Sequence, residues 1–112
     1  GSLVWRSVGG LMDYSDPDTG HVLRGKLDAV CEELGLQYHG VRFRHMGKRI
    51  RVEVHLLFPY GVPVGEAHRL ATLLEDRLPG ALGRAAEVVT HLESVEDHGD
   101  VHESQHYTGK PS

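Results

Sequence analysis

Two stretches of the chain carry apolar residues at the spacing of one helix face. The stripes are Leu23, Leu27, Val30 and Leu34 in the first stretch, and Ala67, Leu70, Ala71, Leu74 and Leu78 in the second. Residues three and four apart lie on the same side of a helix, so amphipathic helices are predicted over residues 21–34 and 64–78. Gly35 follows the first stretch and Pro79-Gly80 follows the second, as is typical of helix ends.

Three other stretches alternate between apolar and polar residues, which predicts strands buried on one face only. They cover residues 39–45, 49–58 and 86–93. The first two are joined by Gly47-Lys48, a pair suited to a two-residue type II′ hairpin turn. That turn would place Val41 opposite Val54 and Gly40 opposite His55, so that His55 lies beside a residue without a side chain.

The predicted order is helix, strand, strand, helix, strand. We expect an α+β fold, a ferredoxin-like open-faced sandwich in which two helices cover one face of a three-stranded antiparallel sheet. Ferredoxin-like topology would put the last strand beside the first, and the first strand would then separate the other two. The uncovered face would carry His55, His91 and Glu93.

The remaining segments flank this unit, which we place at residues 20–94. Gly1 and Ser2 resemble what remains after a tag is cleaved, and residues 1–19 as a whole are predicted to be a membrane-helix exit and linker. Residues 95–112 have little hydrophobicity and no periodicity, which predicts a disordered, acidic, histidine-rich tail. Its histidines, which either capture metal weakly or are simply solvated, are His98, His102 and His106.

Composition narrows the classes of function. A chain of 112 residues and 12.4 kDa has room for one compact domain. Its net charge of -4 argues against nucleic acid as a partner. Cys31 is the only cysteine, which excludes an intramolecular disulfide and fits a reducing compartment. No apolar run approaches the ~20 residues that a membrane span needs.

Histidine is the compositional outlier, with nine in the chain. On the predicted sheet, His55 and His91 would reach toward each other over Gly40, while His39 and Glu93 would add a nitrogen and an oxygen. Such a mixed set suits Zn²⁺ and similar divalent ions. The alternative from spacing alone is a solvated sheet face.

Several motifs resemble those of the C-terminal domain of cation diffusion facilitators, over residues 23–93. They are H-x-V-R-x-R-x-x-G from His39 to Gly47, V-H at Val54 and His55, A-H at Ala67 and His68, and V-x-H-x-E from Val89 to Glu93. In addition, residues 7–13 (SVGGLMD) are similar to the family's exit from its last membrane helix.

The resemblance implies a cytosolic domain appended to a six-helix metal/proton antiporter, at the cytoplasmic face of the cell membrane. It implies a homodimer whose interface binds metal through residues matching His39, His55, His68, His91 and Glu93. The ion would be Zn²⁺ or another divalent transition metal, such as Cd²⁺, Co²⁺, Ni²⁺, Fe²⁺ or Mn²⁺.

We therefore expect a regulatory domain of an efflux transporter, not an enzyme, whose partners are a second copy, metal ions and the transporter's own membrane domain. Bound metal would favour a closed dimer that supports transport. Two alternatives remain open: a stand-alone cytosolic metal-binding protein without a membrane part, and a metal-dependent hydrolase. The hydrolase is the weaker alternative, because the sequence contains no insertion that would form a substrate pocket.

Overall fold

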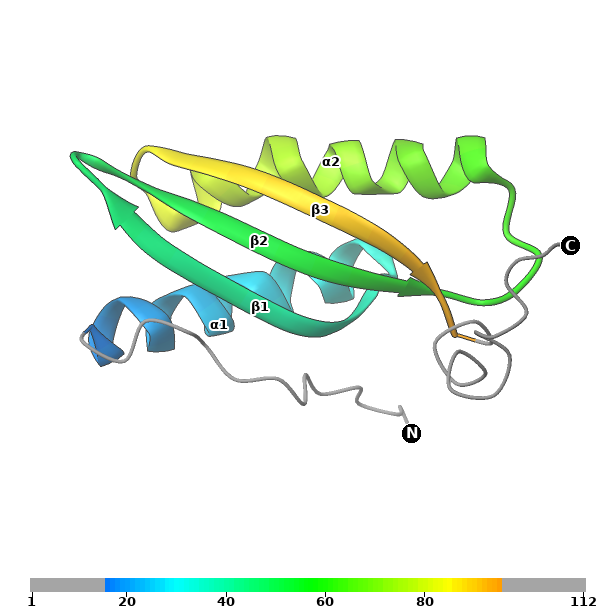
Figure 1. Ribbon diagram of the computed structural model, residues 1–112, viewed down its shortest axis with the longest axis horizontal. Coiled ribbons are helices and arrows are strands. Elements are labelled where there is room, and N and C mark those ends of the chain that lie inside the picture. The colour runs from blue at the N-terminus through cyan, green and yellow to red at the C-terminus, as the bar shows by residue number, and fades with distance from the viewer. Residues whose placement is uncertain (1–15, 96–112) are drawn as a thin grey trace, which may run out of the picture.

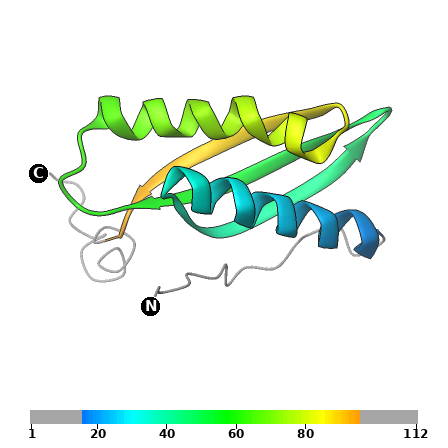
Figure 2. The ribbon, with the colours of Figure 1, turned by 180° about the vertical axis from the view of Figure 1, so that it is seen from behind.

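The computed structural model describes residues 16–95. The elements are helix α1 (Pro17–Leu34), strands β1 (Gln37–Met46) and β2 (Arg49–Phe58), helix α2 (Val64–Leu82) and strand β3 (Ala86–Ser94). This confirms the α+β class and the predicted order. Figure 1 looks onto the open face of the sheet, and Figure 2, from behind, shows both helices on the other face. Residues 1–15 of the predicted linker and residues 96–112 of the predicted tail lie outside the described residues, whereas residues 17–19, predicted as linker, form the first turn of α1.

Helix α1 begins earlier than its apolar stripe indicates because the preceding residues form a cap. The side chain of Asp16 accepts a hydrogen bond from the backbone N–H of Thr19 at 3.1 Å, and Pro17 occupies the first turn. Both features stabilise a helix N-terminus. The helix ends at Gly35, whose φ of 72° gives the left-handed conformation that favours glycine.

Helix α2 continues past the predicted end at Pro79. A proline inside a helix removes the hydrogen bond that its own N–H would donate and crowds the carbonyl four residues earlier, but only one further turn follows Pro79 here. The turn is closed by Gly83, whose N–H donates to the carbonyl of Pro79 at 3.0 Å and whose φ is 70°. The helix therefore ends at Leu82.

The hairpin of β1 and β2 has the predicted register. Val41 pairs with Val54 and Gly40 with His55, and the loop consists of Gly47 and Lys48. Gly47 has a φ of 68°, while no residue other than glycine has a positive φ in the described part of the chain. A type II′ turn requires this combination.

The third strand corrects the predicted sheet. The strand order is β1-β2-β3, and β3 pairs with β2 in parallel, so the sheet is mixed and not wholly antiparallel. The physical reason is the connection: helix α2 carries the chain back along the sheet, so the next strand starts at the same end as β2. Strand β2 is therefore the central strand. The prediction that β1 would separate the strands of His55 and His91 is wrong, because β2 and β3 are direct neighbours.

The core lies between the helices and the covered face of the sheet. Its completely buried side chains include Leu23 and Leu27 of α1, Ile50 of β2, and Leu74 and Leu78 of α2. Each such side chain contributes roughly 1.5–3 kcal/mol to folding. Because this packing holds the three strands in place, it also fixes the backbone positions from which the polar side chains of the opposite face project.

A candidate metal centre on the open sheet face

A bulge in β1 brings His39 onto the open face. Tyr38 pairs with Leu56 and Gly40 with His55, which leaves His39 as an extra residue in the ladder. Tyr38 and Val41 are both buried, although regular alternation would send residues three apart to opposite faces. The bulge resolves this conflict by turning His39 to the same side as Gly40, and re-aiming a side chain is a common role of bulges.

Glu93 connects the two outer strands over β2. Its Oε1 lies 2.7 Å from Nε2 of His39, and its Oε2 lies 2.7 Å from Nδ1 of His55. Each imidazole can donate its N–H to the carboxylate. Partial burial raises the pKa of Glu93, but the hydrogen bonds from His55 and His39 outweigh it, so the pKa of this carboxyl lies below its usual value. Glu93 is therefore ionised at neutral pH.

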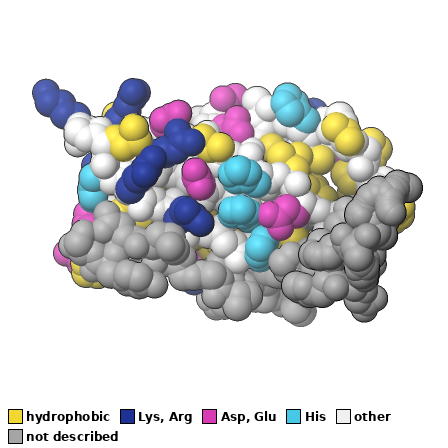
Figure 3. Space-filling model, in the orientation of Figure 1, with side chains coloured by type: hydrophobic (Ala, Val, Ile, Leu, Met, Phe, Trp, Pro, Cys, Tyr) yellow, Lys and Arg dark blue, Asp and Glu magenta, His cyan; other side chains and the backbone are white. Residues whose placement is uncertain are grey.

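The imidazole rings form a row across the sheet. The rings of His39 and His55 meet edge to face with centroids 5.5 Å apart, and those of His55 and His91 stack with centroids 4.7 Å apart. Figure 3 shows histidines beside an acidic side chain on this face. His39, His55 and Glu93 each offer a ligand atom, and these atoms lie within 4.8 Å of one another.

This arrangement fits a divalent transition metal. Two imidazole nitrogens and one carboxylate oxygen are ligands that Zn²⁺ uses, and a small inward movement would bring them to the ~2 Å bond lengths that zinc requires. A bound ion would lie between these ring nitrogens and the carboxylate, and each ring nitrogen that binds it would carry no proton. Since four ligands complete a tetrahedron, one position remains for a further residue or water.

Two of the sequence-predicted ligands lie outside this three-residue group. His91 is exposed and stacks on His55 from the neighbouring strand. His68 is exposed on α2, in the helical layer behind the sheet. The structure thus brings His39, His55 and Glu93 together, keeps His91 adjacent and leaves His68 apart.

Sequence reasoning missed the bulge and the central position of Glu93. A signal for the bulge was present, because Tyr38 and Val41 are apolar three residues apart and enclose a glycine. The role of Gly40 is also corrected. It lies on an edge strand and not between the strands of His55 and His91, and a Cβ added there would be 4.0 Å from Cδ2 of His55.

Across residues 16–95, neither helix has the length and apolar character needed to cross a bilayer.

A family model described as the cytoplasmic domain of cation efflux proteins matches residues 23–95. The name of this family model includes the word dimer. No curated protein matches the chain significantly.

Solved structures agree with this match. A chain of CzrB, a proposed zinc transporter, is 31% identical over 70% of this chain and 94% of its own length, with a TM-score of 0.61. A zinc form of CzrB is 30% identical over 72% of this chain and 90% of its own, with a TM-score of 0.63. The metal-bound C-terminal domain of the CzcD transporter from Thermotoga maritima has the same fold. It is 21% identical over 75% of this chain and 95% of its own, with a TM-score of 0.62. The family is one of transporters and not of enzymes, and the chain belongs to it as the cytoplasmic domain of a cation efflux protein.

Proposed function

We propose that this domain regulates divalent metal efflux by binding Zn²⁺ at a homodimer interface through His39, His55, His91, Glu93 and His68. One observation carries the proposal. The ligand atoms of His39, His55 and Glu93 lie within 4.8 Å of one another on a rigid sheet. This arrangement needs little reorganisation to accept an ion, and a preformed site loses less free energy on binding than one that must be ordered.

The choice of zinc rests on ligand chemistry and on a relative. Imidazole and carboxylate suit Zn²⁺, whereas Cu⁺ would favour thiolate or thioether ligands. The CzrB structure described as a zinc form is 30% identical to this chain. Other divalent transition metals share these ligand preferences, so zinc is the reference ion and not an exclusive one.

A homodimer would explain how His68 could reach the metal site although it lies apart from the histidine row in one protomer. The two helices cover one face of the sheet and the histidine row lies on the other, so His68 and the row belong to different layers of one protomer (Figures 1 and 2). In a dimer, His68 of a second copy can approach the open face of the first. His68 of that copy, or the adjacent His91, would then occupy the one position that His39, His55 and Glu93 leave open.

Metal shared between two protomers supplies a mechanism of regulation. A ligand shifts a conformational equilibrium only when it binds one state more tightly than the other. An ion that needs residues from both protomers binds the closed dimer more tightly than a splayed one. Rising metal concentration would therefore favour the closed dimer, which we propose supports transport by the membrane domain.

Zinc titration of single variants tests this proposal. His39→Ala, His55→Ala and Glu93→Gln should each weaken zinc binding by more than the roughly 10–100-fold that follows loss of an outer-shell partner. His21→Ala, which removes an exposed histidine on α1, is the matched control and should leave the affinity unchanged. Circular dichroism should show that all variants remain folded. Wild-type affinity in any of the three ligand variants would contradict the proposed site.

A further inference from the structure

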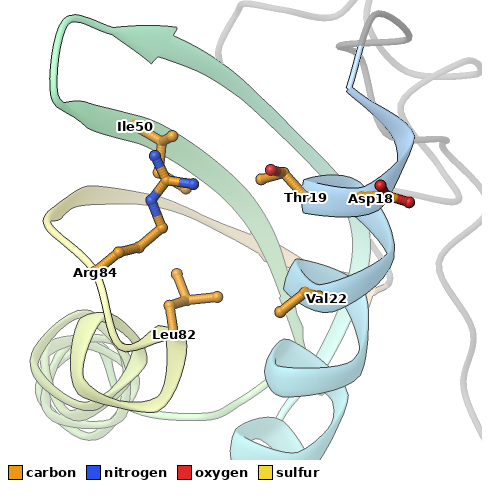
Figure 4. A pocket seen from close by; sticks show the side chains of 6 residues that line it. All are labelled: Asp18, Thr19, Val22, Ile50, Leu82 and Arg84. Atoms are coloured by element: carbon orange, nitrogen blue, oxygen red, sulfur yellow. The ribbon is translucent and has the colours of Figure 1, made fainter.

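Basic side chains gather at the end of the domain formed by the hairpin turn. We call this set the basic end, and its members are Arg44, Lys48 and Arg49 of the hairpin and Arg84 of the loop between α2 and β3, all exposed. Arg84 lies at this end because its neighbour Ala85 is bonded to the start of β2. The N–H of Ile50 donates a hydrogen bond to the carbonyl of Ala85 at 3.2 Å. Figure 4 shows Arg84 beside Ile50, across a hollow from Thr19 of α1.

Among the described residues, the positive charge of the basic end is not cancelled by ion pairs. Arg51, farther along β2, lies 3.1 Å from Glu87 and 3.6 Å from Glu53, and Arg42 lies 3.9 Å from Glu53. These four residues neutralise one another. By contrast, no ion pair within residues 16–95 involves a member of the basic end.

Two acidic residues of the described chain, Asp16 and Asp18, lie at this end. Asp16 accepts hydrogen bonds from the N–H of Thr19 and from Nε2 of His45, the latter at 2.6 Å. Asp18 stands in the first turn of α1 and lines the hollow with Arg84. Lys and Arg side chains occupy the hairpin half of the open face in Figure 3, whereas histidines occupy its middle. A chain with a net charge of -4 thus concentrates positive charge at one end.

The same end receives the preceding part of the chain. Helix α1 begins there, because its cap residue Asp16 contacts His45 near the hairpin turn. Strand β3 finishes at the opposite end of the domain (Figure 1). The chain matches the cytoplasmic domain of cation efflux proteins, and the sequence resemblance implies that the membrane part precedes it. The end where the fold begins would then lie nearest the bilayer.

We propose that the basic end docks onto anionic lipid headgroups of the membrane that holds the transporter. Clusters of four to eight Lys and Arg next to a membrane segment bind anionic lipids through their phosphates and carboxylates. Nucleic acid offers phosphates too, but the overall negative charge of the chain opposes binding to a long polyanion. This docking concerns the orientation of the domain and goes beyond metal regulation. It relies on the place of the domain in a membrane transporter and not on the metal centre.

Co-sedimentation of the chain with lipid vesicles tests the proposal. At low ionic strength and with a chelator present, the wild type should bind vesicles in which roughly a third of the lipid is phosphatidylglycerol, and should not bind pure phosphatidylcholine vesicles. Higher salt should release it, because salt shortens the range of surface electrostatics. Replacing members of the basic end by Gln should weaken binding roughly fivefold for each residue. The variant to compare is R44Q/K48Q/R49Q/R84Q, with the two halves R44Q/K48Q and R49Q/R84Q in case the full set perturbs folding.

The control carries the same change in net charge on the helices, as R24Q/K26Q/R69Q/R77Q. Equal loss in this control would overturn the proposal, because net charge and not the basic end would be responsible. So would wild-type binding that is absent or independent of lipid charge. Tighter binding to a single-stranded DNA oligonucleotide than to the anionic vesicles would assign the surface to nucleic acid instead. Zinc titration of the variant should give wild-type affinity, so failure of this inference is distinguishable from failure of the metal centre.

Discussion

His55 on β2 lies directly opposite His91 on β3, and their imidazole rings stack at an angle of 15°. Parallel pairing of the two strands fixes this relationship. A slip of one residue would turn every side chain of β3 to the other face, which would remove Glu93 from the open face and expose the apolar side of the strand. The core packing of the sheet thus also holds the residues of the candidate metal centre in register.

His55→Ala and His91→Ala should each weaken zinc binding while leaving the fold intact. Both side chains lie on the open face and outside the apolar core. The loss should be larger for His55, because that change removes a member of the three-residue group and the ring on which His91 stacks. Binding calorimetry paired with circular dichroism provides the measurement. Unchanged affinity in either variant would place the metal elsewhere in the chain.

Zinc affinity should fall steeply as the pH drops from about 7.5 to about 5.5. Zinc competes with protons for imidazoles whose ordinary pKa is ~6.5, whereas Glu93, with its lowered pKa, stays ionised over this range. At a zinc concentration a hundred times its dissociation constant, binding stabilises the folded state by ~2.7 kcal/mol. Melting curves at both pH values would show this increment at neutral pH and lose most of it in acid. An equal metal-induced shift at both would mean that histidines are not the principal ligands.

The chain should be a homodimer even without metal. Its core is small and one face of its sheet is uncovered by helices, so pairing would add buried area. Static light scattering at micromolar concentration should give about twice the chain mass of 12.4 kDa. A monomeric mass at every concentration and metal load would contradict the proposed interface.

The cap of α1 should make stability depend on pH in acid. Hydrogen bonds from Thr19 and His45 lower the pKa of Asp16 to about 2. Since this folded-state pKa lies below the unfolded value of ~3.9, the contribution is complete above pH ~4 and is lost as the pH falls toward 2. Asp16→Asn keeps a capping side chain but removes the titrating group, so its denaturant midpoint should vary less than that of the wild type between these pH values.

Asp76→Asn is the control for this effect, because Asp76 is exposed on α2 and has no ion pair within the described residues. It should retain the wild-type pH dependence. If Asp16→Asn retains that dependence as well, the carboxyl of Asp16 is not the group responsible for it.

Cys31 should be chemically inert in the folded protein. Burial raises the pKa of its thiol to about 12, and the nearby carboxylate of Asp28 adds to the effect. Because the thiolate is the reactive form, iodoacetamide should modify Cys31 only after denaturant unfolds the chain. Modification at the same rate in native buffer would show that α1 opens far more readily than its packing indicates.

Local sequence patterns predicted the helices and strands correctly. They did not predict which strand β3 pairs with, because that pairing joins residues far apart in the sequence. Alternation in β2 and β3 assigned His55, His91 and Glu93 to one face, and the Gly47-Lys48 turn fixed the hairpin register, because both depend on neighbouring residues. The side of the hairpin on which the third strand pairs depends on how α2 packs across the sheet. Ferredoxin-like topology suggested the wrong neighbour for that strand.

The geometry of the candidate metal centre was predictable only in part. The residue types of the candidate ligands were evident from the sequence, but the bulge that turns His39 toward Glu93 interrupts the regular alternation on which the prediction relied. The position of His68 is a similar case, because its helical stripe indicates an exposed side chain and not what it would meet in a dimer.

A crystal structure of the chain with zinc, with anomalous data at the zinc edge, would locate the ion directly. We expect an anomalous peak ~2 Å from Nε2 of His39, Nδ1 of His55 and a carboxylate oxygen of Glu93. Zinc bound only elsewhere, for example by His98, His102 and His106, would contradict this expectation.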